Sequence, residues 1–482
     1  MGVEEPQQQQ QQGVKSSCCV VNTHEPILVP PAKSSSAQHK DERYFLTNLD
    51  QNLAVIMQTV YFYKGSGSSE LQQAPRDPVD VVKKSLEEIL ILYYPLAGRL
   101  ALSRDMKLEV LCNDQGALFV EADANVSLEQ FVKDSKLGQG LDANLRQFVY
   151  SVPGAKSVLD IPPLVAQVHH TSSLILKKKE KFVFCNSRSL LQVTRFQCGG
   201  FVLGLSLNHA IFDGIAAMEF VNSWSELARG VPLSVPPCLD RSSLRARNPL
   251  QIEFPHPEFL EVDQPPSDQP AEKSELVFKS IAFDEKKLSS LKEAILREGV
   301  LDKCSSFEAF TALVWKCRTM ATSSDRLSSR QTKLLFAVDA RNRLSPALPR
   351  GYVGNGILLT CALTSVEDLL QGSLSHAIEL IRAAIAKIDN AYLRSVIDFF
   401  EQTRLRPSLE STLVITTWSR LAFHTTDFGW GTPLFTAPAS LPEAEVALFL
   451  PHGESRKGFE LVHGLPERDM KTFVSLMETS WI

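Results

Sequence analysis

One histidine of this chain stands where a general base of an enzyme could act. Residues 201–207, FVLGLSL, form an apolar run that predicts a buried strand, and His209 follows at its end. Asp213 comes four residues later, directly before Gly214. A histidine held at the end of a buried strand can take a proton from a substrate in an enclosed site. We therefore predict chemistry at His209.

Both residues also have a structural explanation. Among ten histidines, chance alone would place an aspartate four residues downstream of about 0.5 of them at ordinary usage. His209 could be a hydrogen-bonded core histidine. Asp213 precedes a helical pattern that Gly230 would end, so we interpret it first as the N-cap of that helix.

A second motif, DFGWG at 427–431, lies about two hundred residues further on. Together, HxxxDG and DFGWG resemble the signature pair of the plant BAHD family of CoA-dependent acyltransferases. Other landmarks follow in the family's order: LVPP at 28–31, LD at 49–50, YPLAGR at 94–99, DAR at 339–341 and GYVGN at 351–355. The resemblance covers the chain from about residue 25 to the end.

The resemblance implies an α+β fold of two chloramphenicol-acetyltransferase-like domains with the active-site tunnel between them. Strands and helices without regular βαβ alternation agree with that class. We expect a disordered tail over residues 1–23, an N-terminal domain over 24–235, a Pro-rich crossover linker over 236–273 and a C-terminal domain over 274–482.

The reaction implied is acyl transfer from a CoA thioester to an alcohol or amine, with His209 as general base. Trp418, on the strand before DFGWG, would donate to the oxyanion or would simply be a core tryptophan. Asp213 would pair with Arg341 and hold the His209 loop. Supporting positions without a chemical step would be Gly214, Asp427, Gly429, Trp430 and Gly431. Ile211 and Phe212 would line the acceptor tunnel, or belong to the core.

The sequence around both motifs looks most like the branch of the family that acylates long-chain hydroxy compounds. The expected reaction moves a feruloyl-type hydroxycinnamoyl group to the hydroxyl of an omega-hydroxy fatty acid or a fatty alcohol, as in suberin or cutin aromatics. The alternatives are a shikimate, quinate or polyamine transferase, and an inactive CoA-binding relative.

Composition limits the partners. A net charge of −5 argues against general nucleic-acid binding, and no stretch is apolar enough for a signal or a membrane span. Nine scattered cysteines favour reduced thiols, so we expect a cytoplasmic protein. We expect a monomer that uses acyl-CoA as co-substrate, with no metal and no resident cofactor.

One segment does not fit its surroundings. AQV at 166–168 leads into a basic, Ser-rich stretch, and QV returns at 192–193. Removing the 25 residues Val168–Gln192 joins Gln167 to Val193 and restores the family's pattern. Valine codons begin with GT and glutamine can be CAG, the usual ends of an intron. We interpret the segment as a translated intron; the alternative is a genuine surface loop.

Local patterns predict further elements. Asp77 and Pro78 would open a helix that Pro95 ends. Residues 108–120 read as a hairpin around NDQG, and residues 373–400 read as strongly helical. Strands are expected at 52–63, 334–338, 356–363, 412–417 and 446–450, and a helix with Met470 and Phe473 on its apolar face near the end.

Overall fold

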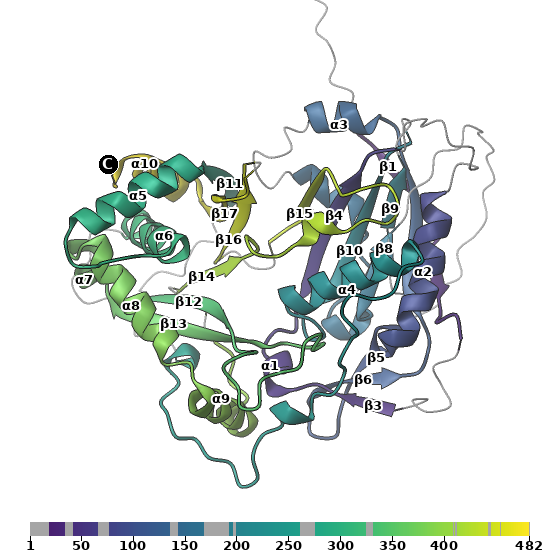
Figure 1. Ribbon diagram of the computed structural model, residues 1–482, viewed down its shortest axis with the longest axis horizontal. Coiled ribbons are helices and arrows are strands. Elements are labelled where there is room, and N and C mark those ends of the chain that lie inside the picture. Colours follow the sequence, from purple (N-terminus) through teal and green to yellow (C-terminus); the bar gives the residue numbers. More distant parts are fainter. Residues whose placement is uncertain are drawn as a thin grey trace, which may run out of the picture.

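Two large β-sheets, each with helices against it, make up the chain (Figure 1). The computed structural model describes residues 19–33, 42–65, 77–134, 143–167, 192–195, 199–260, 275–323, 331–407, 409, 412–441, 445–453 and 455–481. This mixture of helices and sheets in two sheet-rich domains agrees with the α+β class expected from the sequence. The domain boundaries given above stay predictions.

The first sheet has eight strands, mostly from the first half of the chain. Its main order is β1 (Val21–Thr23), β7 (Ala117–Ala124), β8 (Leu164–Gln167), β10 (Phe201–Asn208), β4 (Ile56–Tyr63) and β15 (Phe435–Pro438), with β2 (Ile27–Val29) and β9 (Gln192–Arg195) off this path. All eight residues of β10 are buried, as its apolar run predicts. β15 comes from the second half and pairs with β4, so the C-terminal half contributes an edge to the N-terminal sheet.

Strands β8 and β9 together occupy one position of this sheet, between β7 and β10. On β10, Leu205 pairs with Ala166 of β8 and the next residue along the ladder, Gly204, pairs with Gln192 of β9. On β7, Phe119 pairs with Ala166 and Val120 with Gln192. The two segments therefore continue one another in register, as a single strand would. The anomalous segment falls between them, and its residues 168–191 lie outside the described part of the chain.

The second sheet has six strands, all from the second half. Their order is β11 (Leu276–Phe283), β17 (Gly458–Pro466), β16 (Val446–His452), β14 (Thr412–Thr417), β12 (Gln331–Asp339) and β13 (Ile357–Ser365). The parallel pairs β12–β14 and β14–β16 make it a mixed sheet. A small third sheet consists of β3 (Glu42–Phe45), β6 (Leu108–Cys112) and β5 (Arg99–Leu102).

The helices begin where their capping residues predict. Asp77 caps α2 (Pro78–Leu92) and Asp213 caps α4 (Gly214–Ala228), each by accepting a backbone N–H. The others are α1 (Asn48–Gln51), α3 (Leu128–Asp134), α5 (Glu285–Arg297), α6 (Ser306–Thr322), α7 (Val366–Gln371), α8 (Leu374–Ala386), α9 (Asn390–Thr403) and α10 (Glu467–Thr479). Short 3-10 turns cover Tyr94–Ala97, Ala143–Phe148, Val158–Asp160, Ser242–Leu244, Pro257–Phe259 and Phe423–Thr425.

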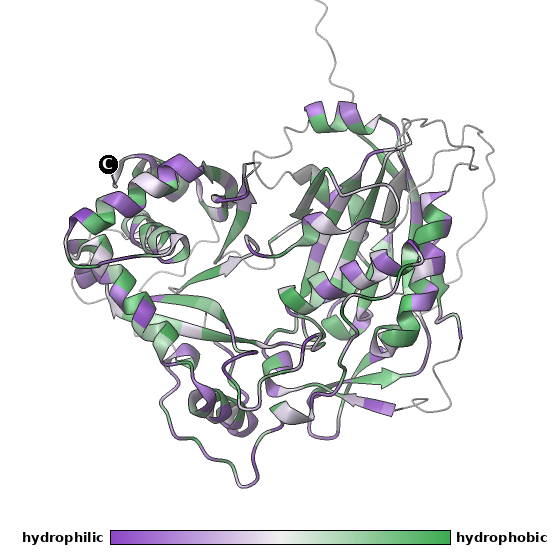
Figure 2. Ribbon diagram, viewed as in Figure 1, coloured by the Kyte–Doolittle hydropathy of each residue, from purple (hydrophilic) through white to green (hydrophobic). Residues whose placement is uncertain are grey.

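The helices are amphipathic, and their apolar faces form the hydrophobic cores. In Figure 2 hydrophilic and hydrophobic residues alternate around α2, α4, α5 and α8, while the sheet strands are largely hydrophobic. One core cluster surrounds Trp224 of α4 against the first sheet, and another surrounds Trp315 of α6 against the second. Burial of these faces supplies the main stabilisation of each domain.

One sequence expectation on local structure is wrong. Residues 108–112 and 117–120 form strands, but they do not pair as a hairpin: β6 pairs with β3 and β5, whereas β7 belongs to the large sheet. Asp114 and Gly116 both have positive φ, and this turn redirects the chain from one sheet to the other. The expected helical stretch over 373–400 is confirmed, and it consists of two helices, α8 and α9, because Asp389 caps a new helix.

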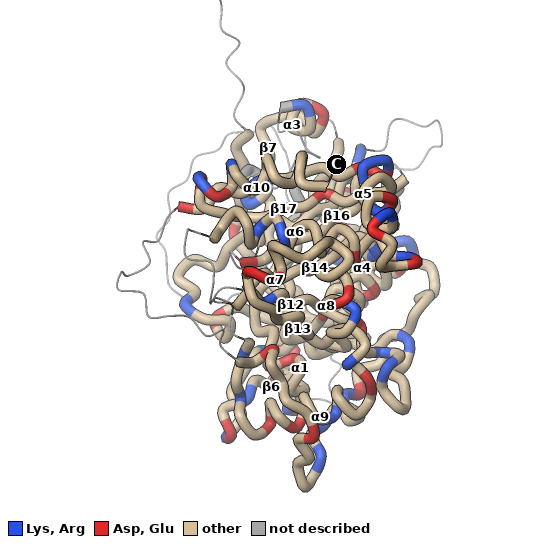
Figure 3. The backbone as a smooth tube through the Cα atoms, turned by 90° about the vertical axis from the view of Figure 1, so that its left-hand side faces the viewer, with Lys and Arg blue, Asp and Glu red and all other residues tan. Residues whose placement is uncertain are grey.

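Charges of both signs are interspersed over the face of the C-terminal half shown in Figure 3. A mixed surface of this kind creates no extended single-sign field for a polyanion. Within the described ranges, no helix combines the length and apolar character that crossing a membrane requires.

Candidate active site

His209 directly follows β10, and the backbone just before β4 holds it. Its backbone N–H donates to the Val55 carbonyl at 2.8 Å. The ring Nδ1 lies 3.1 Å from Oδ1 of Asn355, which belongs to the loop before β13. Residues from the two halves of the chain therefore meet at this imidazole, as a site between two domains requires.

The partners of Asn355 determine which way its amide points. Its Nδ2 donates to Asp50 Oδ1 and to the His209 carbonyl, both at 2.8 Å. Both partners only accept, so the remaining amide atom facing the imidazole is the oxygen. Nδ1 of His209 must then carry the proton, and Nε2 keeps a free lone pair. That is the tautomer of a general base.

A buried ion pair fixes Asn355 in turn. Asp50 is wholly buried and accepts from Arg241 Nη1 at 2.8 Å, and it also accepts the backbone N–H of Asn355 at 2.9 Å. Arg241 donates further to the carbonyls of Val353 and Ile211. The guanidinium thus ties together the loops on both sides of the imidazole. Such a charged network holds its members rigidly because each buried group has a partner.

Electrostatics keep His209 neutral. Burial lowers its pKa below the ordinary histidine value, while Asp213 and the hydrogen bond to Asn355 act in the opposite direction without reversing the shift. A neutral imidazole at physiological pH can accept a proton.

Asp213 faces Arg341, and its carboxylate is fully used by the protein. Oδ1 accepts from Ala216 N–H as the N-cap of α4, and Oδ2 accepts from Gly356 N–H at 2.8 Å. Arg341 contacts both oxygens at 2.8 Å. No oxygen is left to act on a substrate, which supports the structural interpretation of Asp213. The pair also ties the loop after His209 to the loop that carries Asn355.

The DFGWG motif folds as a turn fixed to the first sheet. Asp427 Oδ1 accepts the backbone N–H groups of Gly429 and Gly431, both of which have positive φ. Arg229, the C-cap of α4, lies against Asp427. Trp430 packs edge-on against Phe201, the first residue of β10. His209 precedes the N-terminus of α4, and a helix of fifteen residues is about 22 Å long. The motif therefore lies at the far end of α4 from the imidazole, which supports the structural interpretation.

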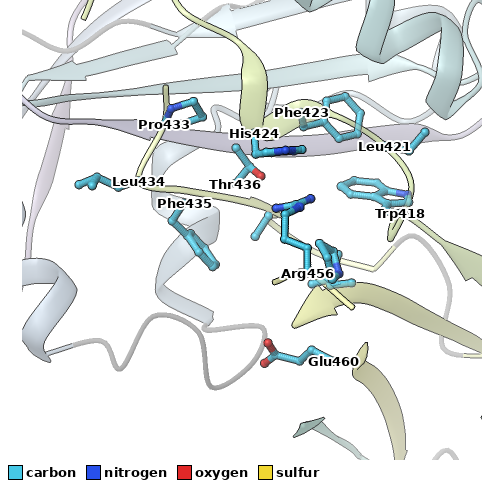
Figure 4. Close-up of a pocket in the computed structure, with 13 residues that line it drawn as sticks. Trp418, Leu421, Phe423, His424, Pro433, Leu434, Phe435, Thr436, Arg456 and Glu460 are labelled. Atoms are coloured by element: carbon cyan, nitrogen blue, oxygen red, sulfur yellow. The ribbon is translucent and has the colours of Figure 1, made fainter. Parts of the chain in front are cut away.

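Trp418 lines a pocket together with aromatic and aliphatic side chains (Figure 4). The indole N–H groups of Trp224, Trp315 and Trp481 all donate hydrogen bonds. That of Trp418 makes none with the described residues, so it is available to a bound oxygen atom. Its ring packs on Phe423 at 5.5 Å between centroids. Trp418 is thus a pocket wall as well as a core contact.

Gly214 supports the site by lacking a side chain. A methyl group there would come within 2.8 Å of Leu421 Cδ1, which lines the same pocket as Trp418. By contrast, Ile211 and Phe212 are buried in the core around α2 and α4, where Phe212 stacks on Phe220. Neither is among the residues that line the Trp418 pocket. Their packing agrees with the alternative that Ile211 and Phe212 belong to the core rather than line the acceptor tunnel.

Sequence reasoning did not assign site roles to Asn355, Asp50 or Arg241. Asp50 and Asn355 stand in two landmarks noted in the sequence, LD and GYVGN, but only their positions in the fold show that they act on the same imidazole. No motif or periodic pattern in the sequence pointed to Arg241, because it lies in the irregular stretch after α4.

Known proteins share this architecture and sequence. A model of the Transferase family matches residues 20–172 and 186–480. The chain belongs to this family, the BAHD acyltransferases. The BAHD match omits residues 173–185, which fall inside the segment interpreted as an insertion.

Two BAHD relatives from Arabidopsis thaliana match almost throughout. Omega-hydroxypalmitate O-feruloyl transferase is 45% identical over 93% of this chain and 91% of its own length. Fatty alcohol:caffeoyl-CoA acyltransferase is 43% identical over 94% of this chain and 97% of its own. Among solved structures, vinorine synthase has a similar fold, with a TM-score of 0.69, 24% identity and coverage of 95% of this chain and 98% of that one.

Proposed function

We propose that this BAHD acyltransferase moves a feruloyl-type hydroxycinnamoyl group from CoA to the hydroxyl of a long-chain omega-hydroxy fatty acid or fatty alcohol. The two Arabidopsis relatives support the substrate classes by their names and their identity to this chain. The observation that carries the chemistry is the neutral His209 with its Nδ1 held by Asn355.

In the first step, Nε2 of His209 takes the proton of the acceptor hydroxyl as its oxygen attacks the thioester carbonyl carbon. A new C–O bond forms, and the carbonyl oxygen becomes an oxyanion that the free indole N–H of Trp418 would stabilise. The imidazolium that results keeps its Nδ1–H on Asn355, so the ring does not turn during the step.

In the second step, the tetrahedral intermediate collapses and the C–S bond breaks. Nε2 of His209 returns its proton to the departing CoA thiolate, which leaves an ester, free CoA and a neutral imidazole. The chain itself forms no covalent bond. Holding both substrates beside one imidazole supplies much of the acceleration through proximity.

Asp213 and Arg341 act as positioning residues in this mechanism, because their pair joins the loops that carry His209 and Asn355. We also propose a monomeric enzyme of the cytoplasm, with acyl-CoA as a co-substrate rather than a resident cofactor. All residues of the catalytic network come from one chain, which supports the monomer.

The test is the product formed by the purified full chain with feruloyl-CoA. Mass spectrometry should detect the feruloyl ester of 16-hydroxypalmitate or 1-hexadecanol and little product with shikimate, quinate or spermidine. Preference for shikimate, quinate or the amine would overturn the acceptor assignment. CoA binding without any ester, in a folded protein, would favour the inactive relative.

A further inference from the structure

The Trp418 pocket contains a guanidinium, that of Arg456, which pairs with no carboxylate of the described residues. Arg456 lines this pocket, between walls that include Phe435, Leu434 and Pro451. Among the residues that the structure describes, no hydrogen-bond or charged partner acts on its side chain. Burial is the one cause that lowers its pKa, and no carboxylate opposes the shift. The side chain of Arg456 is partly exposed, so water can solvate the guanidinium until the carboxylate of a ligand takes its place.

The carboxylate of the same pocket is already engaged elsewhere. Glu460 accepts from the Ser280 hydroxyl and lies 3.7 Å from His452 Nδ1. Figure 4 shows the guanidinium of Arg456 pointing away from Glu460 and towards His424 and Thr436. The next residue, Lys457, pairs instead with Glu285 at the protein surface. The two adjacent cations of this turn therefore differ: Lys457 pairs with Glu285 at the surface, whereas Arg456 faces the pocket and pairs with no carboxylate of the described residues.

Arg456 stands in a turn with a left-handed backbone. Its φ is +55°, in the left-handed region that residues with a side chain seldom adopt. The turn is closed by its N–H donating to the Gly453 carbonyl at 3.0 Å. Strain of this kind persists where a function requires the resulting direction.

His424 adds a second polar group to the part of the pocket that holds Arg456. Its Nδ1 is buried without a hydrogen-bond partner among the described residues. Burial lowers the pKa of His424, and the charge of Arg456 lowers it further, so the ring is neutral beside the cation. One full positive charge and one unsatisfied imidazole nitrogen in an apolar pocket fit a small oxyanion at the end of an apolar chain.

The position of the pocket suits one end of a long acceptor. Leu421 lies against Gly214, close after His209 in the chain, and also lines the pocket. Thr436, another lining residue, pairs with Tyr61 of β4, while His209 bonds to Val55 of the same segment.

We propose that Arg456, with His424 beside it, binds the carboxylate of an omega-hydroxy fatty acid while the terminal hydroxyl lies at His209. The proposal rests on the proposed function and goes further, because it makes Arg456 the residue that favours hydroxy acids over fatty alcohols. The two Arabidopsis relatives differ by name in whether the acceptor carries that carboxylate. Arg456 is a specificity residue here and takes no part in bond making.

The first test compares acceptors in the full chain, using Arg456→Gln and the adjacent control Lys457→Gln. With feruloyl-CoA, Arg456→Gln should raise KM for 16-hydroxypalmitate about ten-fold or more and leave kcat nearly unchanged. KM for 1-hexadecanol should stay within about two-fold in every variant. An equal rise for both acceptors, a rise in KM for feruloyl-CoA, or no change would overturn the proposal. A rise for feruloyl-CoA would assign Arg456 to a CoA phosphate instead.

The second test does not need turnover and so separates this inference from the proposed function. Palmitate carries the carboxylate but no terminal hydroxyl, and its binding can be measured by calorimetry. Palmitate should bind wild type and Lys457→Gln and bind Arg456→Gln at least about ten-fold more weakly. Equal palmitate affinity in all three chains would sink the carboxylate site even if the esters form. Failure of ester formation with intact, Arg456-dependent palmitate binding would overturn only the reaction.

Discussion

At the scale of residues, the site depends on the proton position of one imidazole. The NH2 group of Asn355 already donates to Asp50 and to the His209 carbonyl, so only its amide oxygen faces the imidazole. This oxygen accepts a hydrogen bond, and Nδ1 of His209 must therefore carry the proton. The network thereby selects the tautomer, and burial selects the neutral form. The tautomer and the neutral charge state of His209 are therefore both set in the protein without substrate.

The pH profile of wild-type activity should reflect this lowered pKa. Protonated His209 cannot accept a proton, so kcat/KM should be flat around pH 7 and fall only below the ordinary histidine pKa of about 6.5. Asp213→Asn removes the charge that most strongly raises the pKa of His209. The acid limb should then move to lower pH, which a purely structural loss would not produce. An unmoved or raised limb would contradict the electrostatic account.

Removing the amide that orients the ring should reduce turnover. Asn355→Ala deprives Nδ1–H of its acceptor and leaves Asp50 with one fewer donor. We expect kcat to fall about ten- to a hundred-fold, the usual cost of losing a partner that orients a functional histidine, while KM changes little. Steady-state kinetics on folded protein measure this. Unchanged kcat would show that the ring needs no such support.

At the scale of elements, we interpret the DFGWG turn as a structural brace rather than a reactive group. Its aspartate binds its own glycine N–H groups, its Phe428 packs edge-on against Trp224, and its Trp430 packs on β10. α4 lies between this brace and the His209 loop. A defect in the turn should therefore weaken the fold before it alters the chemistry.

Gly429→Ala tests the brace. Gly429 has a φ of +106°, and nothing lies within 4 Å of where a Cβ would stand. The cost is then backbone strain alone, of the order of 1–3 kcal/mol. Denaturant unfolding should show this loss, and kcat of the remaining folded enzyme should be nearly normal. Thr432→Ala, an exposed change beside the turn, is the control and should cost nothing measurable.

The strand formed by β8 and β9 is interrupted by the anomalous segment. Because β8 and β9 are in continuous register on both neighbours, a chain without Val168–Gln192 needs no rearrangement of the sheet. We expect that shortened chain to fold with equal or greater stability and to keep activity, since closing a loop costs only about 1 kcal/mol. Thermal unfolding of the two chains measures it. Loss of folding in the shortened chain, or transcripts that always retain these codons, would refute the intron interpretation.

At the scale of the whole molecule, the sequence and the fold agree in the parts where local patterns decide. The α2 and α4 caps and the apolar β10 were predicted from local patterns, and the order of the landmarks was sufficient to predict the family. The pairing of β6 and β7 could not be read from a turn motif, because the choice of sheet depends on contacts far along the chain. The Asp50–Asn355–His209 network joins residues from both halves of the chain, so spacing alone could not reveal it.

Stability of the whole molecule should rise with pH on the acid side. Burial lowers the pKa of His463 to about 4 in the folded chain, against about 6.5 when unfolded. Between these values the unfolded chain binds the extra proton, so stability present above pH 6.5 is lost towards pH 4. The loss is about 3 kcal/mol by linkage. His463→Gln should flatten this slope in denaturant unfolding at stepped pH; an unchanged slope would contradict the assignment.

The central claim is that His209 is the general base, and replacing it gives the most direct test. His209→Ala should lower kcat/KM for feruloyl transfer to a long-chain acceptor by a factor of about 10² to 10⁴, while circular dichroism and Tm stay close to wild type. Asp213→Asn, measured beside it, should lose less. Wild-type turnover by folded His209→Ala would contradict the account.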